Sequence, residues 1–466
     1  MKFRRHRSRR ARASAKPKRA ARPRSTRQTP PGPRAKAWVA RDHRVLSPSL
    51  TRTYPLVVAK GEGAVITDVD GHRYLDYTSG IAVTATGHCH PSVVDAIIRQ
   101  AKALIHMSGT DFYYPSEIRL AEQLTQLAPG RAPKQCFLTN SGTEATEAGM
   151  KLARYATGRP YFLAFFGGFH GRTYGAMSLS ASKAVHKRGF GPLVPGVFHA
   201  PYADCYRCPY GLKPQSCDTH CVSVIKDELF KRAVPPEEVA AIVVEPIQGE
   251  GGYIVPPDGY LTKLRALADE FGILLMVDEI QTGMGRTGRL WGCDHDGVAP
   301  DLLMTAKALA SGLPLGALIA DARLMSWKPG AHANTFGGNP IACEAALVTL
   351  QLLTDDLIAN AARVGRHLLA QCRELQARHR LIGDVRGRGL MIGLDLVRDR
   401  LTKEPAVEER GRVIRRCFEK GLLILGCGAS VVRLMPPLIL TRRQADEAVA
   451  ILDDVLTEVE RERCAA

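Results

Sequence analysis

No stretch of this 466-residue chain approaches the ~18 uninterrupted apolar residues that a membrane-spanning helix requires. Aromatic residues are also scarce at 6%, although 45% of residues are hydrophobic and 24% are charged. Such a composition allows a large buried core and excludes collagen-like, fibrous and wholly disordered chains. We therefore expect no membrane partner, and the length indicates two or three structural units.

Paired cysteines are lacking too, because the twelve cysteines are scattered singly apart from one cluster. This pattern excludes a disulfide scaffold and, without a secretory apolar segment, indicates reduced thiols and a cytoplasmic location. The cluster contains Cys205, Cys208, Cys217 and Cys221. Its C-x2-C-x8-C-x3-C spacing leaves a structural metal or redox clip open, but the central spacer is shorter than in usual zinc fingers. Free thiols are the favoured interpretation, and we predict no metal site.

Acidic residues are absent from residues 1–36, which contain 15 Lys and Arg. The rest of the chain has 49 basic and 46 acidic residues, so the net charge of +18 belongs almost entirely to this segment. Because it has few aliphatic side chains, we predict a disordered basic tail. A transit peptide would need an amphipathic apolar face. A tether to nucleic acid would lack sequence preference without interleaved aromatics, so a plain extension is favoured.

Five short apolar runs each end at a polar or glycine-rich cluster. The runs are Gln135–Leu138, Tyr161–Phe166, Ala241–Val244, Ile273–Val277 and Leu302–Met304. Helical patterns such as those at 144–155 and 260–271 lie between them, which predicts an α/β fold with a mostly parallel sheet. Ligands of such sheets bind at the carboxyl ends of the strands, where these polar clusters fall.

The pattern changes after residue 340. Ile341–Leu353 and Asp356–His379 are predicted as long helices, followed by short strand-like pieces and a final amphipathic helix. We therefore expect a large domain over 91–340 and a smaller C-terminal α/β domain over 341–466. Residues 37–90 are expected to form the N-terminal segment of this smaller domain.

Lys307 is the only charged residue between Asp301 and Asp321. Desolvation in such apolar surroundings lowers the pKa of a lysine toward that of a nucleophilic amine, as Schiff-base chemistry requires. A lysine that extends to solvent at a helix start is the alternative.

Two other clusters could complete a cofactor site. Asn140-Ser-Gly-Thr-Glu144 opens a helix directly after a strand, where free amides suit a phosphate, although it could be an ordinary helix cap. Asp278 follows the apolar run ILLMV, so its carboxylate needs a cation such as a protonated pyridine nitrogen. Phe169 could lie flat against a planar ring or simply pack in the core.

Gly283-Met-Gly-Arg-Thr-Gly288 fits the G-x-G-x-x-G dinucleotide motif. That motif must open a helix directly after a strand, whereas here DEIQT intervenes. We therefore do not expect a nicotinamide oxidoreductase.

Taken together, six motifs in order resemble the class III pyridoxal-phosphate aminotransferases, and especially the 4-aminobutyrate, ornithine and acetylornithine group. The motifs are NSGTEATEAGMKLAR (140–154), GFHGRT (168–173), EPIQGEGG (245–252), VDEIQTGMGRTG (277–288), TAK (305–307) and TFGGNP (335–340). The resemblance covers about residues 45–460. It implies the fold type I of pyridoxal-phosphate-dependent transferases and a homodimer with shared active sites.

The resemblance also implies roles for individual residues. Lys307 would bind pyridoxal 5'-phosphate as a Schiff base and then act as general base and acid. Asp278 would keep the pyridine nitrogen protonated, Phe169 would stack on the ring, and Gln281 would reach its phenolic oxygen.

The phosphate group would bind to the backbone amides of Gly142 and Thr143, according to the same resemblance. The partner subunit's Thr335 would add a hydroxyl. The active site would thus be complete only in the dimer.

Carboxylate-binding residues bear on the substrate. Arg172 and Arg433 match the family's carboxylate sites, Glu245 matches a carboxylate lining the site, and Glu250 matches a switch glutamate. Glu250 would neutralise Arg433 for an ω-amino substrate and would release it for 2-oxoglutarate. The alternative for Arg433 alone is a surface ion pair, but an arginine in an apolar strand requires a partner.

Ile81 falls where 4-aminobutyrate enzymes carry an aliphatic residue and ornithine enzymes tend to carry tyrosine. This favours a 4-aminobutyrate-like donor with 2-oxoglutarate as acceptor. Tyr54 keeps an ornithine or acetylornithine aminotransferase open. The insertion around Cys205–Cys221 resembles a branch in which amino-acid racemases also occur, so a racemase or epimerase is a further alternative.

Overall fold

The computed structural model describes residues 30–465, so most of the predicted tail lies outside the described residues. The structure differs from the prediction at the tail's end, because helix α1 (Pro33–Val45) begins before Lys36. The Asp70 carboxylate accepts hydrogen bonds from the amides of Arg34, at 3.0 Å, and Ala35, at 2.8 Å. These bonds satisfy the first turn of α1 from a distant part of the chain, which the local sequence could not reveal.

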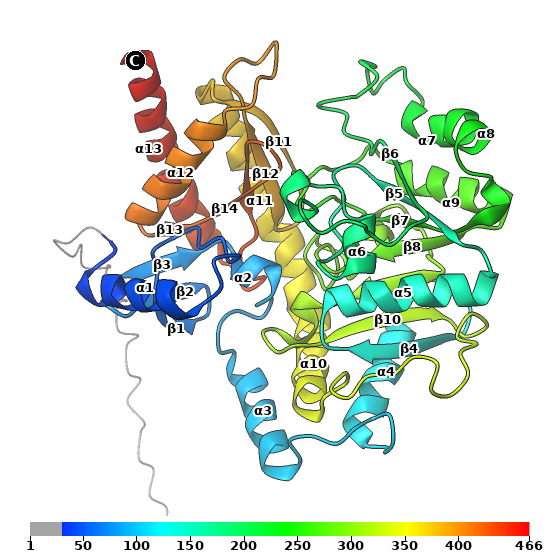
Figure 1. Cartoon of the computed structure of the whole chain (residues 1–466). Coiled ribbons are helices and arrows are strands. Elements are labelled where there is room, and N and C mark those ends of the chain that lie inside the picture. Colours follow the sequence, from blue (N-terminus) through cyan, green and yellow to red (C-terminus); the bar gives the residue numbers. More distant parts are fainter. Residues whose placement is uncertain (1–29, 466) are drawn as a thin grey trace, which may run out of the picture.

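A seven-stranded sheet lies in the right-hand part of the molecule in Figure 1, in the order β4-β10-β9-β8-β7-β5-β6. Neighbouring strands from β9 to β6 are parallel, whereas β10 is antiparallel to both β4 and β9. The strands are β4 (Lys134–Thr139), β5 (Tyr161–Phe165), β6 (Val197–Ala200), β7 (Val239–Val244), β8 (Leu274–Asp278), β9 (Leu302–Thr305) and β10 (Gly316–Asp321). All five predicted strands are present, and the α/β fold with a mostly parallel sheet is confirmed.

Helices cover both faces of this sheet, which explains why its central strands are apolar along their whole length. Successive strand residues point to opposite faces. Val243 packs in one cluster with residues of α5 (Gly142–Thr157). Ile242, its neighbour, packs in another with α4 (Pro115–Leu127) and α9 (Tyr260–Phe271).

The C-terminal part contains a smaller antiparallel sheet in the order β11-β12-β15-β14. Its elements are α10 (Pro340–Leu352), α11 (Ile358–Arg378), β11 (Ile382–Arg388), β12 (Met391–Leu396), α12 (Val407–Glu419), β14 (Leu425–Cys427), β15 (Val431–Leu434) and α13 (Arg442–Ala465). The N-terminal strands β1 (Val58–Glu62), β2 (Val65–Asp68) and β3 (Arg73–Asp76) form a third sheet with β13 (Leu422–Leu423). Because β13 pairs with β3, the two ends of the described chain are joined in one sheet.

The described cysteines form no metal centre. No group of three or more His, Cys, Asp or Glu side chains within residues 30–465 is arranged to hold a metal ion. Cys205, Cys208, Cys217 and Cys221 are free and partly buried. Their insertion leads into the short helices α7 (His220–Val224) and α8 (Phe230–Arg232).

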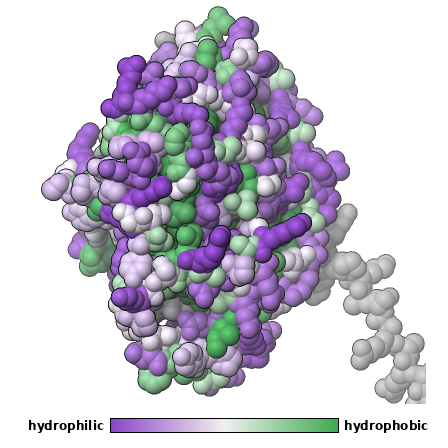
Figure 2. Space-filling model, turned by 90° about the vertical axis from the view of Figure 1, so that its right-hand side faces the viewer, coloured by the Kyte–Doolittle hydropathy of each residue, from purple (hydrophilic) through white to green (hydrophobic). Residues whose placement is uncertain are grey.

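Hydrophilic residues cover much of the face shown in Figure 2, with hydrophobic residues between them. In the part of the chain from residue 30 to residue 465, no helix has the length and apolar character needed to cross a membrane.

Candidate active site

Lys307 lies at the carboxyl end of β9, where the chain turns into a short 3-10 segment. Its φ of 44° is in the left-handed region, which is uncommon for a residue other than glycine. Burial lowers the pKa of its amine, although Asp278 and Glu245 act in the opposite direction. Within the described residues this amine makes no hydrogen bond or ion pair. Lys307 therefore presents a free amine of lowered pKa at the strand ends.

Three buried titratable side chains lie together at the neighbouring strand ends. His170 Nδ1 is 2.8 Å from Asp278 Oδ2, and the amides of Phe169 and Gly249 each donate to Glu245 at 3.0 Å. Burial alone would lower the pKa of His170, but the hydrogen bond and charge of Asp278 raise it above the ordinary value. Burial raises the pKa of Glu245. His170 is thus the side-chain partner of the buried Asp278 carboxylate.

The first turn of α5 forms a cradle of free amides. Ser141 caps the helix by accepting from the amide of Glu144 at 3.4 Å, and the amides of Gly142 and Thr143 have no partner within the described chain. A Cβ on Gly142 would lie 2.8 Å from Cδ1 of Ile280, so a larger residue would require the Ile280 side chain to move. Two donors at the positive end of a 16-residue helix suit a phosphate group.

The loop that carries Phe169 continues beside this cradle. The Thr143 hydroxyl lies 2.7 Å from that of Thr173, at the start of α6 (Tyr174–Leu179). The Phe169 ring packs edge-on against His186, with centroids 5.5 Å apart, and the exposed Arg172 has its guanidinium carbon 5.6 Å from the Phe169 ring. One loop therefore brings Phe169 and Arg172 near the amides that suit a phosphate.

Arg433 lies on β15 with only 5% of its surface exposed, and it pairs with Glu250 at 3.0 Å. Lys183 pairs with the other oxygen of Glu250 at 2.6 Å. Burial would raise the pKa of Glu250, but Arg433 and Lys183 lower it below the ordinary value. The structure thus assembles the expected arginine and glutamate, together with a second cation that sequence reasoning missed.

The remaining predicted residues are less closely tied to this cluster. Gln281 accepts a hydrogen bond from the hydroxyl of the buried Tyr253 at 2.9 Å. Ile81 is 46% exposed and has a φ of 69° in the short helix α2 (Ser79–Ala82). Thr335 is exposed and makes no side-chain hydrogen bond within residues 30–465. Tyr54 bonds through its hydroxyl to the backbone of Ile424.

Sequence reasoning also missed the role of His170, although the residue lies inside one of the quoted motifs. A buried aspartate at a strand end requires a partner, and a histidine after β5, two strands away in the sheet, was available to supply it. The sequence contains only an indirect indication of Lys183: a glutamate that leaves Arg433 for part of the reaction needs another cation nearby.

Comparisons with known proteins agree with this geometry. Residues 47–456 match the family described as aminotransferase class-III. The chain is 37% identical over 445 residues to an alanine/serine racemase of Pyrococcus horikoshii, covering 93% of each chain. It is 38% identical over 436 residues to a 4-aminobutyrate aminotransferase of Mycobacterium tuberculosis, covering 92% of this chain and 97% of the relative. A solved amine transaminase from an uncultivated Pseudomonas species, with pyridoxal phosphate bound, superposes with a TM-score of 0.82 at 33% identity, covering 95% and 99% of the two chains.

The residues present fit this cofactor. Pyridoxal phosphate requires a lysine amine, a partner for its pyridine nitrogen and donors for its phosphate. The free amine of Lys307, the carboxylate of Asp278 and the unpaired amides of Gly142 and Thr143 supply one each. The chain therefore belongs to the class III aminotransferases and is a pyridoxal-phosphate-dependent enzyme.

Proposed function

We propose that this enzyme transfers the amino group of an ω-amino acid resembling 4-aminobutyrate to 2-oxoglutarate. The observation that carries the proposal is the ion pair between Arg433 and Glu250, with N and O 3.0 Å apart. A transaminase must accept two different acids in turn in one site. An arginine that binds a substrate carboxylate in one half of the reaction and pairs with a glutamate in the other half meets this requirement.

The pair explains the two halves of the reaction as follows. An ω-amino donor has no carboxylate on its reacting carbon, so Glu250 can stay on Arg433 and keep the buried guanidinium neutralised. 2-Oxoglutarate has a carboxylate there, which binds Arg433 once Glu250 moves away. The planar guanidinium matches a carboxylate in a bidentate manner. Lys183 already holds the second oxygen of Glu250, so it offers the glutamate a partner when Arg433 is occupied.

Three residues handle the proton. Bound pyridoxal phosphate supplies an electron sink that lets the substrate carbon lose a proton. Lys307, with its lowered pKa, takes this proton and returns it as general base and acid. Asp278 holds a proton on the ring nitrogen, and His170, 2.8 Å from Asp278 Oδ2, positions that carboxylate. Gly142 and Thr143 bind the phosphate, and Phe169 stacks on the ring.

Arg172 and Ile81 complete the donor site in this proposal. Arg172 binds the distal carboxylate of the donor and is placed near the Phe169 ring. Ile81 contributes an aliphatic contact, and Glu245 lines the site beside Asp278. Gln281 reaches the phenolic oxygen of the cofactor, and its side-chain oxygen accepts a hydrogen bond from the hydroxyl of Tyr253.

A racemase or epimerase is the second candidate, because relatives at 37–38% identity include the alanine/serine racemase and a leucine/methionine racemase of Thermococcus litoralis. 4-Aminobutyrate separates the two activities, since its reacting carbon is not a stereocentre. Turnover of 4-aminobutyrate with formation of glutamate can only be amino transfer. An ornithine enzyme is less well supported, because Tyr54 is bonded to Ile424.

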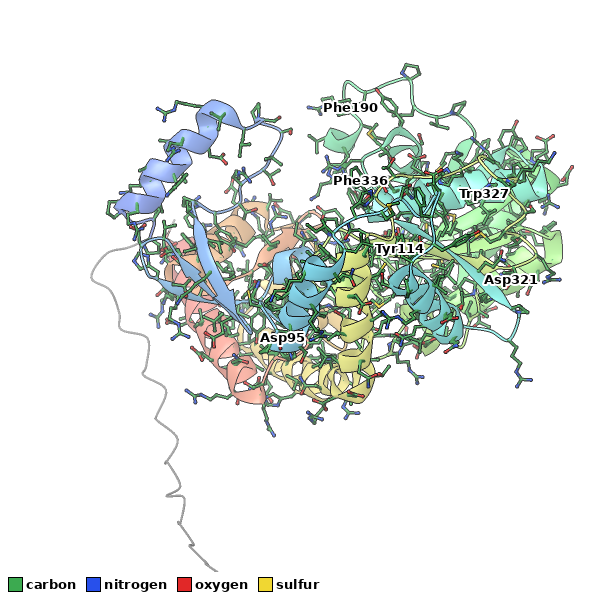
Figure 3. All side chains as sticks on the ribbon, turned by 90° about the horizontal axis from the view of Figure 1, so that it is seen from below. Asp95, Tyr114, Phe190, Asp321, Trp327 and Phe336 are labelled. Atoms are coloured by element: carbon green, nitrogen blue, oxygen red, sulfur yellow. The ribbon has the colours of Figure 1, made fainter. Side chains whose placement is uncertain are left out.

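We also propose a homodimer with shared active sites. Exposed apolar side chains gather around the segment between α3 (Pro91–Ala103) and α4, including Ile105 at 64% exposure. The loop of Thr335 lies beside this segment: the ring of Phe336, 60% exposed, is 5.0 Å from that of His106. Figure 3 shows Phe336 near Tyr114 at this place. Association through this surface would give Thr335 a neighbouring active site.

The test is a panel of amino donors with 2-oxoglutarate, assayed for glutamate and for the keto acid or aldehyde product. We expect one glutamate per oxidised donor with 4-aminobutyrate, and little D-amino acid from L-amino acids alone. Accumulation of the D-enantiomer without a keto acid, together with no turnover of ω-amines, would contradict the proposal and favour the racemase. Sedimentation of the same preparation tests the dimer independently.

A further inference from the structure

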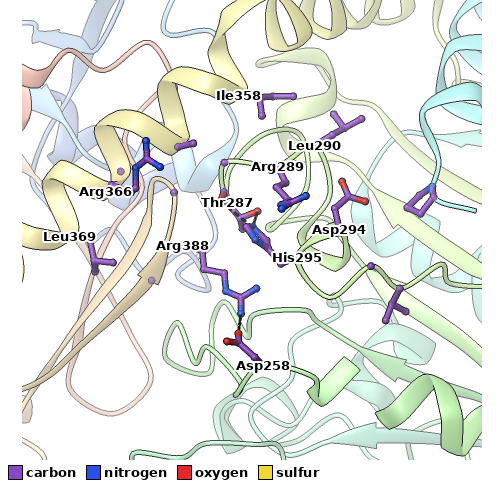
Figure 4. A pocket seen from close by; sticks show the side chains of 18 of the residues that line it. Asp258, Thr287, Arg289, Leu290, Asp294, His295, Ile358, Arg366, Leu369 and Arg388 are labelled. Carbon is purple, nitrogen blue, oxygen red and sulfur yellow. Dashed lines mark hydrogen bonds and ion pairs between the residues drawn. The ribbon is translucent and has the colours of Figure 1, made fainter. Parts of the chain in front are cut away.

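A cleft of about 1260 Å³ lies away from the candidate active site (Figure 4). One wall is the segment 287–299 that follows β8, and the other is formed by α11 and the turn between β11 and β12. No residue assigned to the active site lines it. Small-molecule sites usually occupy roughly 300–1000 Å³. The cleft therefore has room for a ligand larger than a simple inorganic ion.

Glycines form the floor of the cleft and bring three segments into backbone contact. A Cβ on Gly389 would lie 2.4 Å from the carbonyl carbon of Thr287, and one on Gly365 would lie 2.1 Å from the carbonyl oxygen of Gly389. A Cβ on Gly288 would lie 3.0 Å from Ala362 of α11. Gly288 is the last glycine of the G-x-G-x-x-G run. Its close packing against α11 explains why glycine stands at this position, although the motif opens no helix.

The charged residues of the cleft are mainly basic. Arg289 from the loop and Arg366 from α11 are exposed on opposite walls and make no ion pair with any described residue. Arg388 pairs with Asp258 at 2.8 Å, but Asp258 is 98% exposed, and such a pair is readily exchanged. Figure 4 shows these guanidinium groups around the same opening.

The two acidic lining residues do not cancel this charge. Asp258 is the exposed partner of Arg388 at the rim. Asp294 accepts a hydrogen bond from the amide of Trp291 at 3.0 Å and lies near Arg289, so it offsets one of the three arginines and leaves the lining with a net positive charge. Apolar side chains also line the cleft and could contact the uncharged part of a ligand. They are Leu290, Val298, Ile358 and Leu369.

We propose that this cleft is a second binding site, for an organic polyanion of nucleotide size. Phosphate or carboxylate groups of the ligand bind Arg289 and Arg366 from opposite walls, because guanidinium groups match both anions. Arg388 exchanges Asp258 for the ligand, and the apolar side chains contact its organic part. The proposal does not depend on which amino donor the enzyme uses.

The test is calorimetric titration of the cofactor-loaded enzyme in buffer freed of metal ions by a chelating resin, with and without 2-oxoglutarate, so that metal ions do not contribute and binding at the active site is distinguished from binding at the cleft. The probes are ATP, pyrophosphate, citrate and adenosine. We expect saturable binding of ATP, weaker binding of pyrophosphate or citrate, and none of adenosine. ATP against pyrophosphate measures the contribution of the organic part, and citrate distinguishes a carboxylate ligand from a phosphate ligand.

The double variant R289A/R366A should bind ATP about tenfold more weakly or worse, because it loses two charge-assisted contacts. R373A is the matched control: Arg373 is exposed on the same helix but does not line the cleft. It should change the dissociation constant less than twofold. Retained amino-transfer activity shows that both proteins are folded. Absence of binding by every anionic probe, or the same loss in R373A as in R289A/R366A, would overturn the proposal.

Discussion

Replacing Arg433 by methionine should separate the two half-reactions of the enzyme. Methionine has an unbranched side chain like that of arginine but carries no charge. It therefore fills much of the same space on β15 and limits the cavity at this buried position. Glu250 does not become an unpaired charge, because Lys183 remains 2.6 Å from it. The variant is therefore expected to fold, and the change should fall on substrate binding rather than on stability.

The loss should be large only where Arg433 binds a carboxylate. A hydrogen bond to a charged group contributes about 1.5–3 kcal/mol, which corresponds to roughly 10- to 150-fold in kcat/KM. We expect this loss in the half-reaction with 2-oxoglutarate, and less than about threefold loss with 4-aminobutyrate, which leaves Arg433 covered by Glu250. Single-turnover absorbance changes of the cofactor measure each half-reaction separately.

A matched control is available nearby. Arg410 donates to the carbonyl of Ala429 at 2.9 Å, at the turn before β15, and belongs to no proposed substrate contact. Arg410→Met should leave both half-reactions unchanged. Equal losses in both half-reactions of Arg433→Met would refute the glutamate switch, since they would mean that Arg433 acts on the fold or on the cofactor instead.

Three further outcomes are expected. Lys183→Met should slow the 2-oxoglutarate half-reaction more than that of 4-aminobutyrate, by roughly 2- to 5-fold, because Glu250 loses the cation that holds it away from Arg433; unchanged single-turnover rates would contradict this. Borohydride reduction of the loaded enzyme should fix the cofactor to Lys307, and peptide mapping that finds it on another lysine would reject the assignment. Asp70→Ala should destabilise α1 by about 1 kcal/mol through its lost cap and speed amide exchange over 33–45, whereas unaltered exchange would show that the cap contributes nothing.

Much of the fold could be predicted because the signal is local. Four of the five apolar runs are inner strands, β5, β7, β8 and β9, whose residues are almost all buried, and such runs are visible without any knowledge of their neighbours. The antiparallel direction of β10 could not be predicted in this way. Its sequence GALIAD is as apolar as that of a parallel strand, and the apolar pattern does not show that it pairs antiparallel with both β9 and β4, the latter 177 residues earlier in the chain. The start of α1 was missed for the same reason, since Asp70 is 35 residues from Ala35.

The site residues also differ in whether the local sequence indicates them. Lys307 and Asp278 could be proposed from the sequence because a charge beside an apolar strand is costly and therefore conspicuous. Lys183 was missed because it lies among polar residues, in SLSASKAVHK, where another lysine is unremarkable. Its importance follows only from the distance to Glu250.

The 2.6 Å contact between Lys183 and Glu250 affects how easily Glu250 could leave Arg433 in the proposed switch. With one cation, a glutamate that left the buried Arg433 would have to carry an unpaired charge, which would oppose the movement. With Lys183 already bound to its other oxygen, Glu250 would keep a partner in both positions of the proposed switch. Two cations share one carboxylate here, so the pocket has an unmatched positive charge that the carboxylate of an incoming 2-oxo acid can neutralise. The arrangement thus favours exchange between a substrate with a carboxylate at the reacting carbon and one without.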